Sequence, residues 1–399
     1  MRIGLVVPHI FMQADLLPRV IFSPGVLALD LVDGVAAAGV DVTLFSPGLV
    51  DTSVRNVTAD LSAFKAELAA RGDDYLSLLR KHPLVFVSLA RAVQAELVAK
   101  AFAAANAGEL DIVHIYTNEE EVGLPFAQFC TKPVVFTHHD PFNFAARYRH
   151  SFPRFKHLNW ISMSQAQRRD MPPDTNWAGN VYHGLRPDLF TPRLSGESDY
   201  VAYFGRIVEP KGLHLAIAAV KRYNERPGRP LKLKIAGKHY SGEQDSYWQE
   251  RIAPEIDGET IQYLGFIRDE QAKNEFLAGA RALLTPSTFN EPFGMVMIEA
   301  LACGTPVIGL DSGAIPEVVR KGRTGFVVPK TLRTVRDPKS GRLREVVDET
   351  PTVAALAEAL GRVSSIDRVA CRHDFEVRFT LERMVEGHMS VYRKLVLVS

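Results

Sequence analysis

Short apolar runs alternate with longer segments of helical periodicity along most of the chain. Near the start, residues 3–7 form an apolar run, residues 25–38 carry apolar positions at helical spacing, and residues 41–45 form a second run. This order predicts a β-α-β unit, in which two parallel strands are joined by a crossover helix. The first run is too short for the core of a signal peptide and is interrupted at Pro8, so we interpret it as the first strand of a cytoplasmic protein.

The alternation continues through the first half of the chain. Residues 60–107 have a helical pattern that is broken at residues 82–83, where a proline follows a histidine. Further buried strands are predicted at residues 111–116, 133–137 and 159–164. Ligands of open α/β sheets bind outside the carboxyl ends of the strands, so we look for function in the polar residues that follow each strand.

A second β-α series begins after a segment rich in proline, glycine and charge. We therefore predict a first domain over residues 1–190, a linker over 191–199 and a second domain over 200–372. The strands expected in the second domain are residues 200–204, 231–237, 262–266, 282–286 and 307–309. The charged stretch 330–349 is expected to be a solvated loop, and residues 352–362 and 375–395 are expected to be helices.

Composition excludes several classes of protein. The 399 residues suggest two or three domains, and 47 basic against 46 acidic residues leave a net charge of +1, which gives no electrostatic reason to expect a nucleic-acid partner. No apolar run approaches the length of a membrane span. Cys130, Cys303 and Cys371 are widely spaced without metal-ligand spacing, so we expect buried free thiols in a reducing compartment.

Candidate chemistry is concentrated in residues 287–299. This stretch follows a predicted strand, turns at a proline and a glycine, and opens a helix over residues 295–302. The amides of Gly294, Met295 and Val296 are expected to be unpaired donors for hydroxyl or phosphate oxygens. Glu291 lies in the loop and Glu299 lies inside the helix, so we expect the two carboxylates to contact different parts of one ligand.

Two other strand ends carry candidate residues. Arg206 and Lys211 surround a glycine-containing turn after residues 200–204, an arrangement that suits a pyrophosphate, although each cation alone would be an ordinary surface residue. His139 follows residues 133–137 and could donate to a sugar hydroxyl, bind a metal or be a simple loop residue. Its neighbour His138 diverges from it and no carboxylates at ligand spacing accompany them, which disfavours a metal.

The pair Glu291 and Glu299, with Pro-Phe-Gly between them, resembles the signature of the retaining glycosyltransferases of family 4, also called glycosyl transferase group 1, which have the GT-B fold. Residues 300–309, Ala-Leu-Ala-Cys-Gly-Thr-Pro-Val-Ile-Gly, and residues 322–326, Gly-Arg-Thr-Gly-Phe, continue the pattern. The resemblance implies an α/β protein with two doubly wound, Rossmann-like parallel-sheet domains facing a cleft. The first domain would bind the acceptor and the second the nucleotide sugar, and the helix over 373–399 would pack back on the first.

The resemblance also implies roles for single residues. Arg206 and Lys211 would clamp the diphosphate, Glu299 would bind the ribose hydroxyls, and Glu291 would hold hydroxyls of the donor sugar together with the amides of residues 294–296. His139 would bind a hydroxyl near the anomeric centre. The catalytic set is then His139, Glu291, Arg206 and Lys211, and the donor-binding set adds Gly25, Gly237, Leu264, Phe293, Gly294, Met295, Val296 and Glu299.

Two departures from the family pattern are visible. Gly25 stands alone where many relatives have a glycine pair, so it either approaches the ligand or merely starts a helix. His183 stands where the family usually has asparagine. The segment 161–168 and the sequence Val-Tyr-His-Gly at 181–184 resemble the branch of avilamycin-type antibiotic-sugar transferases.

The expected reaction is transfer of a hexose, with retention of configuration, from a nucleoside-diphosphate sugar to a small-molecule, glycan or lipid acceptor. A UDP-sugar is favoured as donor and GDP-mannose is possible. No Asp-x-Asp pair occurs in the chain, so neither a metal nor another cofactor is expected. Two alternatives stay open: a nucleotide-sugar epimerase or hydrolase on the same scaffold, and a non-catalytic sensor of sugar nucleotides.

Overall fold

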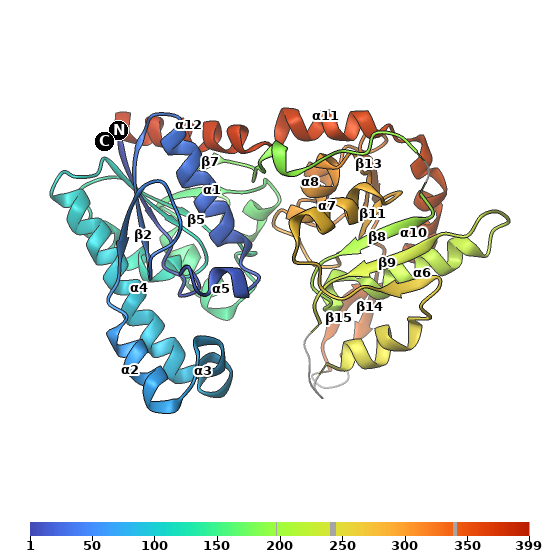
Figure 1. Ribbon diagram of the computed structural model, residues 1–399, viewed down its shortest axis with the longest axis horizontal. Coiled ribbons are helices and arrows are strands. Elements are labelled where there is room, and N and C mark those ends of the chain that lie inside the picture. Colours follow the sequence, from blue (N-terminus) through green and yellow to red (C-terminus); the bar gives the residue numbers. More distant parts are fainter. Residues whose placement is uncertain (197, 240–244, 338–340, 399) are drawn as a thin grey trace. The chain divides into compact units, whose positions relative to one another are not determined.

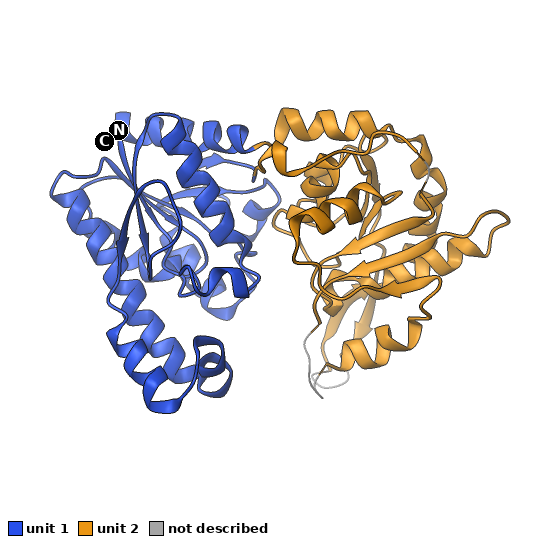
Figure 2. Cartoon of the chain, viewed as in Figure 1, with its two compact units in different colours: residues 1–183, 381–399 blue, residues 184–380 orange. Residues whose placement is uncertain are grey.

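The structure is a computed structural model that describes residues 1–196, 198–239, 245–337 and 341–398. The chain divides into two compact units (Figure 2), unit 1 with residues 1–183 and 381–399 and unit 2 with residues 184–380. The residues from 191 to 196, which the sequence assigned to a linker, belong to unit 2.

Unit 1 is built on a seven-stranded parallel sheet with the order β3-β2-β1-β4-β5-β6-β7 (Figure 1). Its strands are β1 (Arg2–Val6), β2 (Asp41–Ser46), β3 (Arg55–Thr58), β4 (Ile112–Tyr116), β5 (Val134–Thr137), β6 (Asn159–Ser162) and β7 (Trp177–Asn180). The central strand β4 is buried along its whole length, as expected for a parallel sheet that is covered on both faces. The sequence did not predict the edge strands β3 and β7.

Helices cover both faces of the unit 1 sheet. Alternate residues of β1 point to opposite faces: Ile3 and Leu5 line a small apolar cavity with residues of α1 (Ser23–Ala37) and α12 (Leu381–Val398), whereas Val6 joins the core under α4 (Pro83–Asn106). The helices α2 (Ser62–Arg71) and α3 (Tyr75–Lys81) precede α4, and α5 (Ala146–Ser151) follows β5. The predicted break at residues 82–83 is present, because Pro83 starts α4.

Unit 2 has a six-stranded parallel sheet with the order β10-β9-β8-β11-β12-β13. Its strands are β8 (Tyr200–Phe204), β9 (Lys232–Ala236), β10 (Ile261–Tyr263), β11 (Leu283–Thr285), β12 (Val307–Leu310) and β13 (Gly325–Val328). The helices are α6 (Leu213–Asn224), α7 (Glu270–Ala278), α8 (Met295–Ala302), α9 (Ile315–Val318), α10 (Glu349–Arg362) and α11 (Arg368–Arg378). Each crossover returns the chain to the same end of the sheet, so the loops after β8, β9, β11 and β12 share one edge.

Two predictions about elements and one about a cysteine are wrong. The charged stretch 330–349 is not a plain loop, since β14 (Leu332–Arg336) and β15 (Leu343–Val347) pair as an antiparallel hairpin. Residues 338–340 of this stretch lie outside the described residues. The expected helix 375–395 is divided into α11 and α12. Cys303 and Cys371 are buried free thiols as predicted, but Cys130 is only half-buried.

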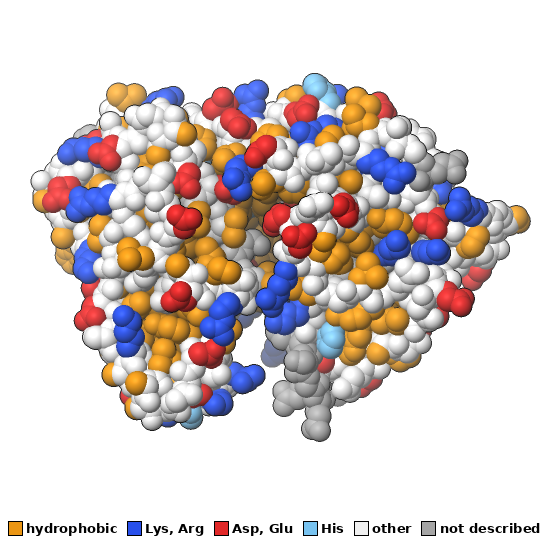
Figure 3. Space-filling model, in the orientation of Figure 1, with side chains coloured by type: hydrophobic (Ala, Val, Ile, Leu, Met, Phe, Trp, Pro, Cys, Tyr) orange, Lys and Arg blue, Asp and Glu red, His pale blue; other side chains and the backbone are white. Residues whose placement is uncertain are grey.

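Over the face drawn in Figure 3, side chains of Lys and Arg are interspersed with those of Asp and Glu. The distribution matches the near balance of charge in the composition. Within the described part of the chain, no helix combines the length and the apolar character that crossing a membrane requires.

Candidate functional site

The loops after β8, β11 and β12 are tied together at one edge of the unit 2 sheet. Thr288 donates from its amide to Pro210 O at 2.8 Å, and Ala314 donates to Glu291 O at 2.8 Å. Gly313, with φ of 54°, lies so close to the Glu291 backbone that a Cβ would be 2.2 Å from its amide nitrogen. Residues from three separate loops therefore form one rigid surface around Glu291.

Lys211 and Glu291 form an ion pair within this surface. The distance from Lys211 Nζ to Glu291 Oε2 is 2.5 Å, and Ser287 Oγ donates to the same oxygen at 3.3 Å. Glu291 is 8% exposed, so its carboxylate is largely removed from water and depends on these two partners. Lys211 Nζ also lies 5.0 Å from the centroid of the Phe289 ring, which favours the cation there.

Arg206 lies in the same loop as Lys211 but is exposed. Its carbonyl accepts a hydrogen bond from the Tyr203 hydroxyl at 3.1 Å, which fixes the backbone at the end of β8. Among the residues that the structure describes, no carboxylate forms an ion pair with the Arg206 guanidinium. The loop thus presents one paired cation and one that is available to an anion.

Glu299 is held by a lysine that the sequence did not single out. Lys273 Nζ on α7 donates to Glu299 Oε1 at 3.1 Å and also contacts Glu270. Burial lowers the pKa of Lys273, but the two carboxylates outweigh it and the pKa is raised, so the ammonium stays charged. No motif in the sequence marks this pair, because its two members are 26 residues apart on different helices.

The helix α8 begins after Gly294, as predicted. Gly294 has φ of 91° and is the residue that precedes the first helical turn, so the amides of Met295 and Val296 have no partner within the helix. Both of these residues are partly exposed, whereas Phe293 is buried and its ring lies 6.0 Å from that of Phe379. Phe293 therefore anchors the turn by packing, which is a structural role.

Gly237 and Leu264 lie at the ends of β9 and β10. Gly237 donates to Gly265 O at 2.9 Å, and a Cβ at Gly237 would be 2.0 Å from Gly205 O, so only glycine allows this approach of two strand ends. Leu264 is 49% exposed. An exposed leucine at the carboxyl edge of the sheet offers an apolar surface to a flat ring.

His139 and Gly25 belong to unit 1, whereas the other predicted site residues belong to unit 2. The His139 ring stacks on His183 with centroids 5.1 Å apart and meets the edge of Tyr116 at 4.5 Å. His139 Nε2 is buried and has no hydrogen-bond partner among the described residues. Burial lowers the pKa of His139 well below its usual value, so the imidazole is neutral at pH 7 and can exchange a hydrogen bond with a hydroxyl.

Gly25 is the third residue of α1, and its amide donates to Phe22 O at 3.0 Å. A Cβ at this position would be 2.6 Å from the Phe22 ring. These contacts support the alternative role weighed for Gly25, that of starting and packing a helix, while its assignment to donor binding stays a prediction.

No group of three or more His, Cys, Asp or Glu side chains is placed to hold a metal ion within the described ranges. The acidic residues of unit 2 that could serve, Glu291 and Glu299, are each paired with a lysine. The arrangement around them offers cations and amide donors, which suit the oxygens of an anion.

The comparisons with known proteins agree with this chemistry. Residues 188–336 match the family model of the glycosyl transferases group 1. The chain is 29% identical over 195 residues to alpha-maltose-1-phosphate synthase of Mycolicibacterium smegmatis, covering 49% of this chain and 48% of that protein. It is 28% identical over 275 residues to phosphatidyl-myo-inositol mannosyltransferase of Mycobacterium leprae, covering 64% and 70%. The match thus spans only about half the length of the first of these relatives.

Solved structures share the fold over the whole chain. Sucrose-phosphate synthase from Thermosynechococcus elongatus has a TM-score of 0.69 at 19% identity, covering 100% of both chains. Anabaena Alr3699/HepE in complex with UDP and glucose has a TM-score of 0.65 at 18% identity, covering 99% and 100%. AviGT4, a glycosyltransferase involved in avilamycin A biosynthesis, has a TM-score of 0.62 at 17% identity, covering 100% and 99%. The predicted GT-B fold of two parallel α/β sheets is confirmed, and residues 188–336 are similar to the glycosyl transferases group 1.

Proposed function

We propose that this protein is a retaining glycosyltransferase that moves a hexose from a nucleoside-diphosphate sugar to a small-molecule, glycan or lipid acceptor without a metal ion. Unit 2 binds the donor and unit 1 the acceptor. The observation that carries the proposal is the surface around Glu291, where the ends of β8, β11 and β12 gather two cations, two glutamates and the start of α8.

Charge develops on the leaving diphosphate during glycosyl transfer, and preorganised donors stabilise it best. Arg206 and Lys211 supply two positive charges, and the first amides of α8 add hydrogen bonds and the helix dipole. Arg206 is the cation without a carboxylate partner among the described residues. It can therefore bind a phosphate without first breaking an ion pair.

Lys211 must exchange its partner when the donor binds. In the structure, Lys211 is paired with Glu291. Phosphate oxygens would replace the carboxylate on the ammonium, which frees Glu291 to accept hydrogen bonds from hydroxyls of the donor sugar. Glu299, oriented by Lys273 through one oxygen, keeps the other oxygen for the ribose hydroxyls.

The donor is proposed to be a UDP-sugar. Anabaena HepE, which has the same fold, is described in complexes with UDP, with UDP and glucose, and with UDP-glucose. Relatives named as mannosyltransferases keep GDP-mannose as the alternative donor. His139 would bind a hydroxyl of a sugar substrate through its buried and unpartnered Nε2.

The proposal is tested by titrating the protein with UDP, GDP and ADP in EDTA while following thermal unfolding. A ligand at 100 times its Kd should stabilise the folded state by about 2.7 kcal/mol, and we expect this with UDP. Arg206→Ala and Lys211→Ala should weaken the effect at least tenfold in Kd, whereas Lys221→Ala, an exposed cation on α6, should not.

Product analysis with a panel of nucleotide sugars and candidate acceptors completes the test. A new glycosidic bond with the donor's anomeric configuration is the expected result. Stabilisation by none of the three nucleotides, or release of free sugar as the main product in the presence of every acceptor, would refute the proposal.

A further inference from the structure

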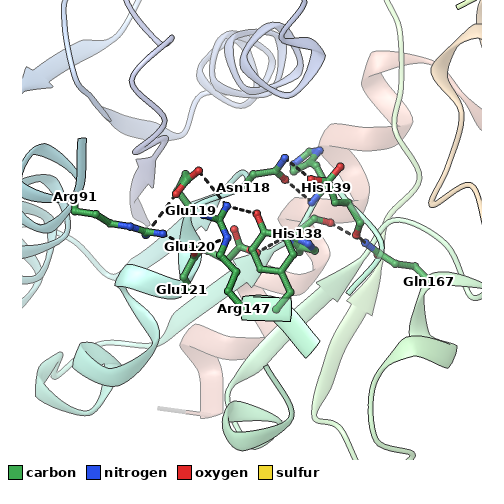
Figure 4. A network of polar contacts seen from close by, with 11 residues as sticks. Arg91, Asn118, Glu119, Glu120, Glu121, His138, His139, Arg147 and Gln167 are labelled. Atoms are coloured by element: carbon green, nitrogen blue, oxygen red, sulfur yellow. Dashed lines mark hydrogen bonds and ion pairs between the residues drawn. The ribbon is translucent and has the colours of Figure 1, made fainter. Parts of the chain in front are cut away.

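A polar network in unit 1 holds the loop that carries His139 (Figure 4). Asn118 follows β4, and its Oδ1 accepts from the His139 backbone amide at 3.2 Å. Its Nδ2 donates to Asp140 Oδ2 at 2.8 Å. One amide side chain therefore fixes two consecutive residues of the loop after β5.

Gln167 holds the same loop from the other neighbouring strand. It follows β6, and its Nε2 donates to His138 O at 2.8 Å and to Asp140 O at 3.0 Å. Its Oε1 accepts from the Met163 amide at 3.1 Å, so all its hydrogen-bonding groups are used and the side chain, 3% exposed, cannot rotate freely. The backbone on both sides of His139 is thus fixed by side chains from the segments that follow β4 and β6.

A contact between two buried side chains also supports the loop that carries His139. The carboxyl of Glu120 contacts His138 Nδ1, and both side chains are fully buried. Burial raises the pKa of Glu120 well above its usual value, and burial lowers the pKa of His138 to about 4, so the imidazole of His138 is neutral at pH 7. The rings of Phe142, Tyr148 and Phe152 surround His138 at 4.5 to 5.1 Å.

The backbone before Glu120 is strained. Glu119 has φ of 99°, a left-handed conformation that costs a residue with a side chain about 1–3 kcal/mol. Arg147 pairs with Glu119 and Glu121, and Arg91 contacts the same two carboxylates from α4 (Figure 4). Such strain persists only where the surroundings fix it, and it marks this loop as a place where geometry matters more than stability.

We propose that Asn118 and Gln167 are positioning residues for glycosyl transfer: together they fix the loop 138–140 so that the His139 imidazole is preorganised to meet a sugar hydroxyl. The inference rests on the proposed function of His139. Neither side chain needs to touch a substrate, because the hydrogen bonds end on the backbone and on Asp140. Misplacing a reacting group by about 1 Å can cost 100-fold in rate.

The test uses near-isosteric variants of the full-length protein. Gln167→Glu removes both donations to the loop but keeps the acceptor for the Met163 amide. Asn118→Asp keeps the acceptor for the His139 amide but places a carboxylate against Asp140. We expect kcat to fall about 10- to 100-fold in each, with the Kd for UDP unchanged within twofold, because unit 2 binds the nucleotide.

A matched control separates positioning from stability. Asn106 fixes the loop at the other end of β5 in the same way, donating to Phe129 O and accepting from the Thr131 amide. Asn106→Asp should lower the thermal midpoint to a similar extent and leave kcat within twofold. If Asn106→Asp loses as much kcat as the two test variants, or if these retain kcat within twofold, the inference is overturned.

Rescue provides the sharper readout. In the double variant Asn118→Asp with Asp140→Asn, the new amide at 140 can donate to the new carboxylate at 118. This restores the hydrogen bond between the two side chains with reversed polarity, while the carboxylate at 118 still accepts from the His139 amide. We expect kcat to recover to the level of Asp140→Asn alone, and lack of recovery contradicts the inference. The NMR resonances of the His139 ring should shift in Asn118→Asp and return in the double variant.

The two proposals fail in distinguishable ways. If the unmodified protein transfers no sugar from any nucleotide donor, the proposed function fails while the NMR experiment still tests the positioning. If the unmodified protein is active and the variants are equally active, only the positioning role fails.

Discussion

At the scale of single residues, the ion pair of Lys211 and Glu291 connects the geometry of the site to its proposed chemistry. A largely buried carboxylate 2.5 Å from an ammonium is stable only while both partners remain. An anionic ligand that approaches Lys211 competes with Glu291 and is repelled by it. The carboxylate that would hold the donor sugar therefore opposes the binding of a bare diphosphate.

The variant Glu291→Gln should separate these two effects. Removing the negative charge should tighten the binding of UDP about fivefold, since roughly 1 kcal/mol of carboxylate–phosphate repulsion is lost. Transfer from the complete donor should fall at least 100-fold, because a neutral amide holds the sugar hydroxyls less strongly. Calorimetric titration with UDP and initial rates with the nucleotide sugar measure the two quantities.

Glu299→Gln is the comparison for this prediction. Glu299 is paired with Lys273 and not with the proposed phosphate-binding cations, so its substitution should weaken UDP binding. Equal changes of the same sign in the two variants would show that Glu291 does not compete for Lys211.

At the scale of elements, close backbone contacts between loops set the geometry of the site. Gly212 has φ of 71° and precedes α6, and a Cβ there would be 2.1 Å from Pro286 O at the end of β11. Gly258 has a similar φ of 78°, but a Cβ there would have no neighbour within 4 Å. Replacing either glycine would therefore strain the backbone, but only at Gly212 would the new side chain also collide with a neighbouring atom.

Gly258→Ala should cost about 1 kcal/mol of unfolding free energy, the price of the left-handed conformation alone. Gly212→Ala should cost about 3 kcal/mol or more, because the contact with a backbone oxygen cannot relax without moving β11. It should also weaken UDP binding, since Lys211 is the adjacent residue. Urea titration of the two variants measures both losses of unfolding free energy. Equal losses would mean that the loops after β8 and β11 move easily to accept the new side chain.

Sequence patterns predicted the elements that bury a whole face or follow a strong motif. The strand β8 and the helix α8 begin and end at the predicted residues, because continuous apolar runs and the turn Pro292–Gly294 mark their boundaries. The edge strands β3, β7 and β13 were missed. β3 and β7 are only partly buried and carry polar residues, and β13 has only four residues, the first of which is a glycine. The predicted strands were recognised by continuous apolar runs, and such a run is absent where a strand is only partly buried.

The remaining misses come from contacts between distant residues. The hairpin of β14 and β15 has few buried positions, so its composition resembled a loop. The break between α11 and α12 has no glycine or proline; there Phe379 is fully buried and Thr380 bridges to Leu185. The pairing of Lys211 with Glu291 joins residues 80 positions apart. Asn118 belongs to no motif, and Gln167 lies in the segment 161–168, whose resemblance to one branch of the family gave it no role.

At the scale of the whole molecule, buried imidazoles make stability depend on pH. His9, His138 and His388 have their pKa lowered to about 4 by burial, and the pKa of His183 is lowered to about 3. All four belong to unit 1. In the unfolded chain each would titrate near 6.5, so unfolding takes up protons between pH 6.5 and about 4.

The sign of the effect follows from this uptake. Stability from groups with a lowered pKa is fully present above pH 6.5 and is lost as the pH falls, because the unfolded state binds more protons. Glu120 acts in the opposite direction, since its raised pKa gives stability that is present below pH 4.5 and lost as the pH rises through its folded-state value. Burial also raises the pKa of Asp170, but the histidines outnumber these two carboxyls, so unit 1 should become less stable on acidification.

We therefore expect the free energy of unfolding of unit 1, followed by the fluorescence of the fully buried Trp160, to decrease steadily from pH 7 to pH 5. His388 is 1% exposed, lies between His114, Tyr116 and Tyr392, and makes one hydrogen bond to Met384 O. Replacing it in His388→Phe should reduce the slope by up to one proton, about 1.4 kcal/mol per pH unit. The exposed His150→Phe is the control and should leave the slope unchanged. A flat profile in the unmodified protein, or an identical slope in His388→Phe, would mean that these imidazoles are reached by water and protonate without unfolding.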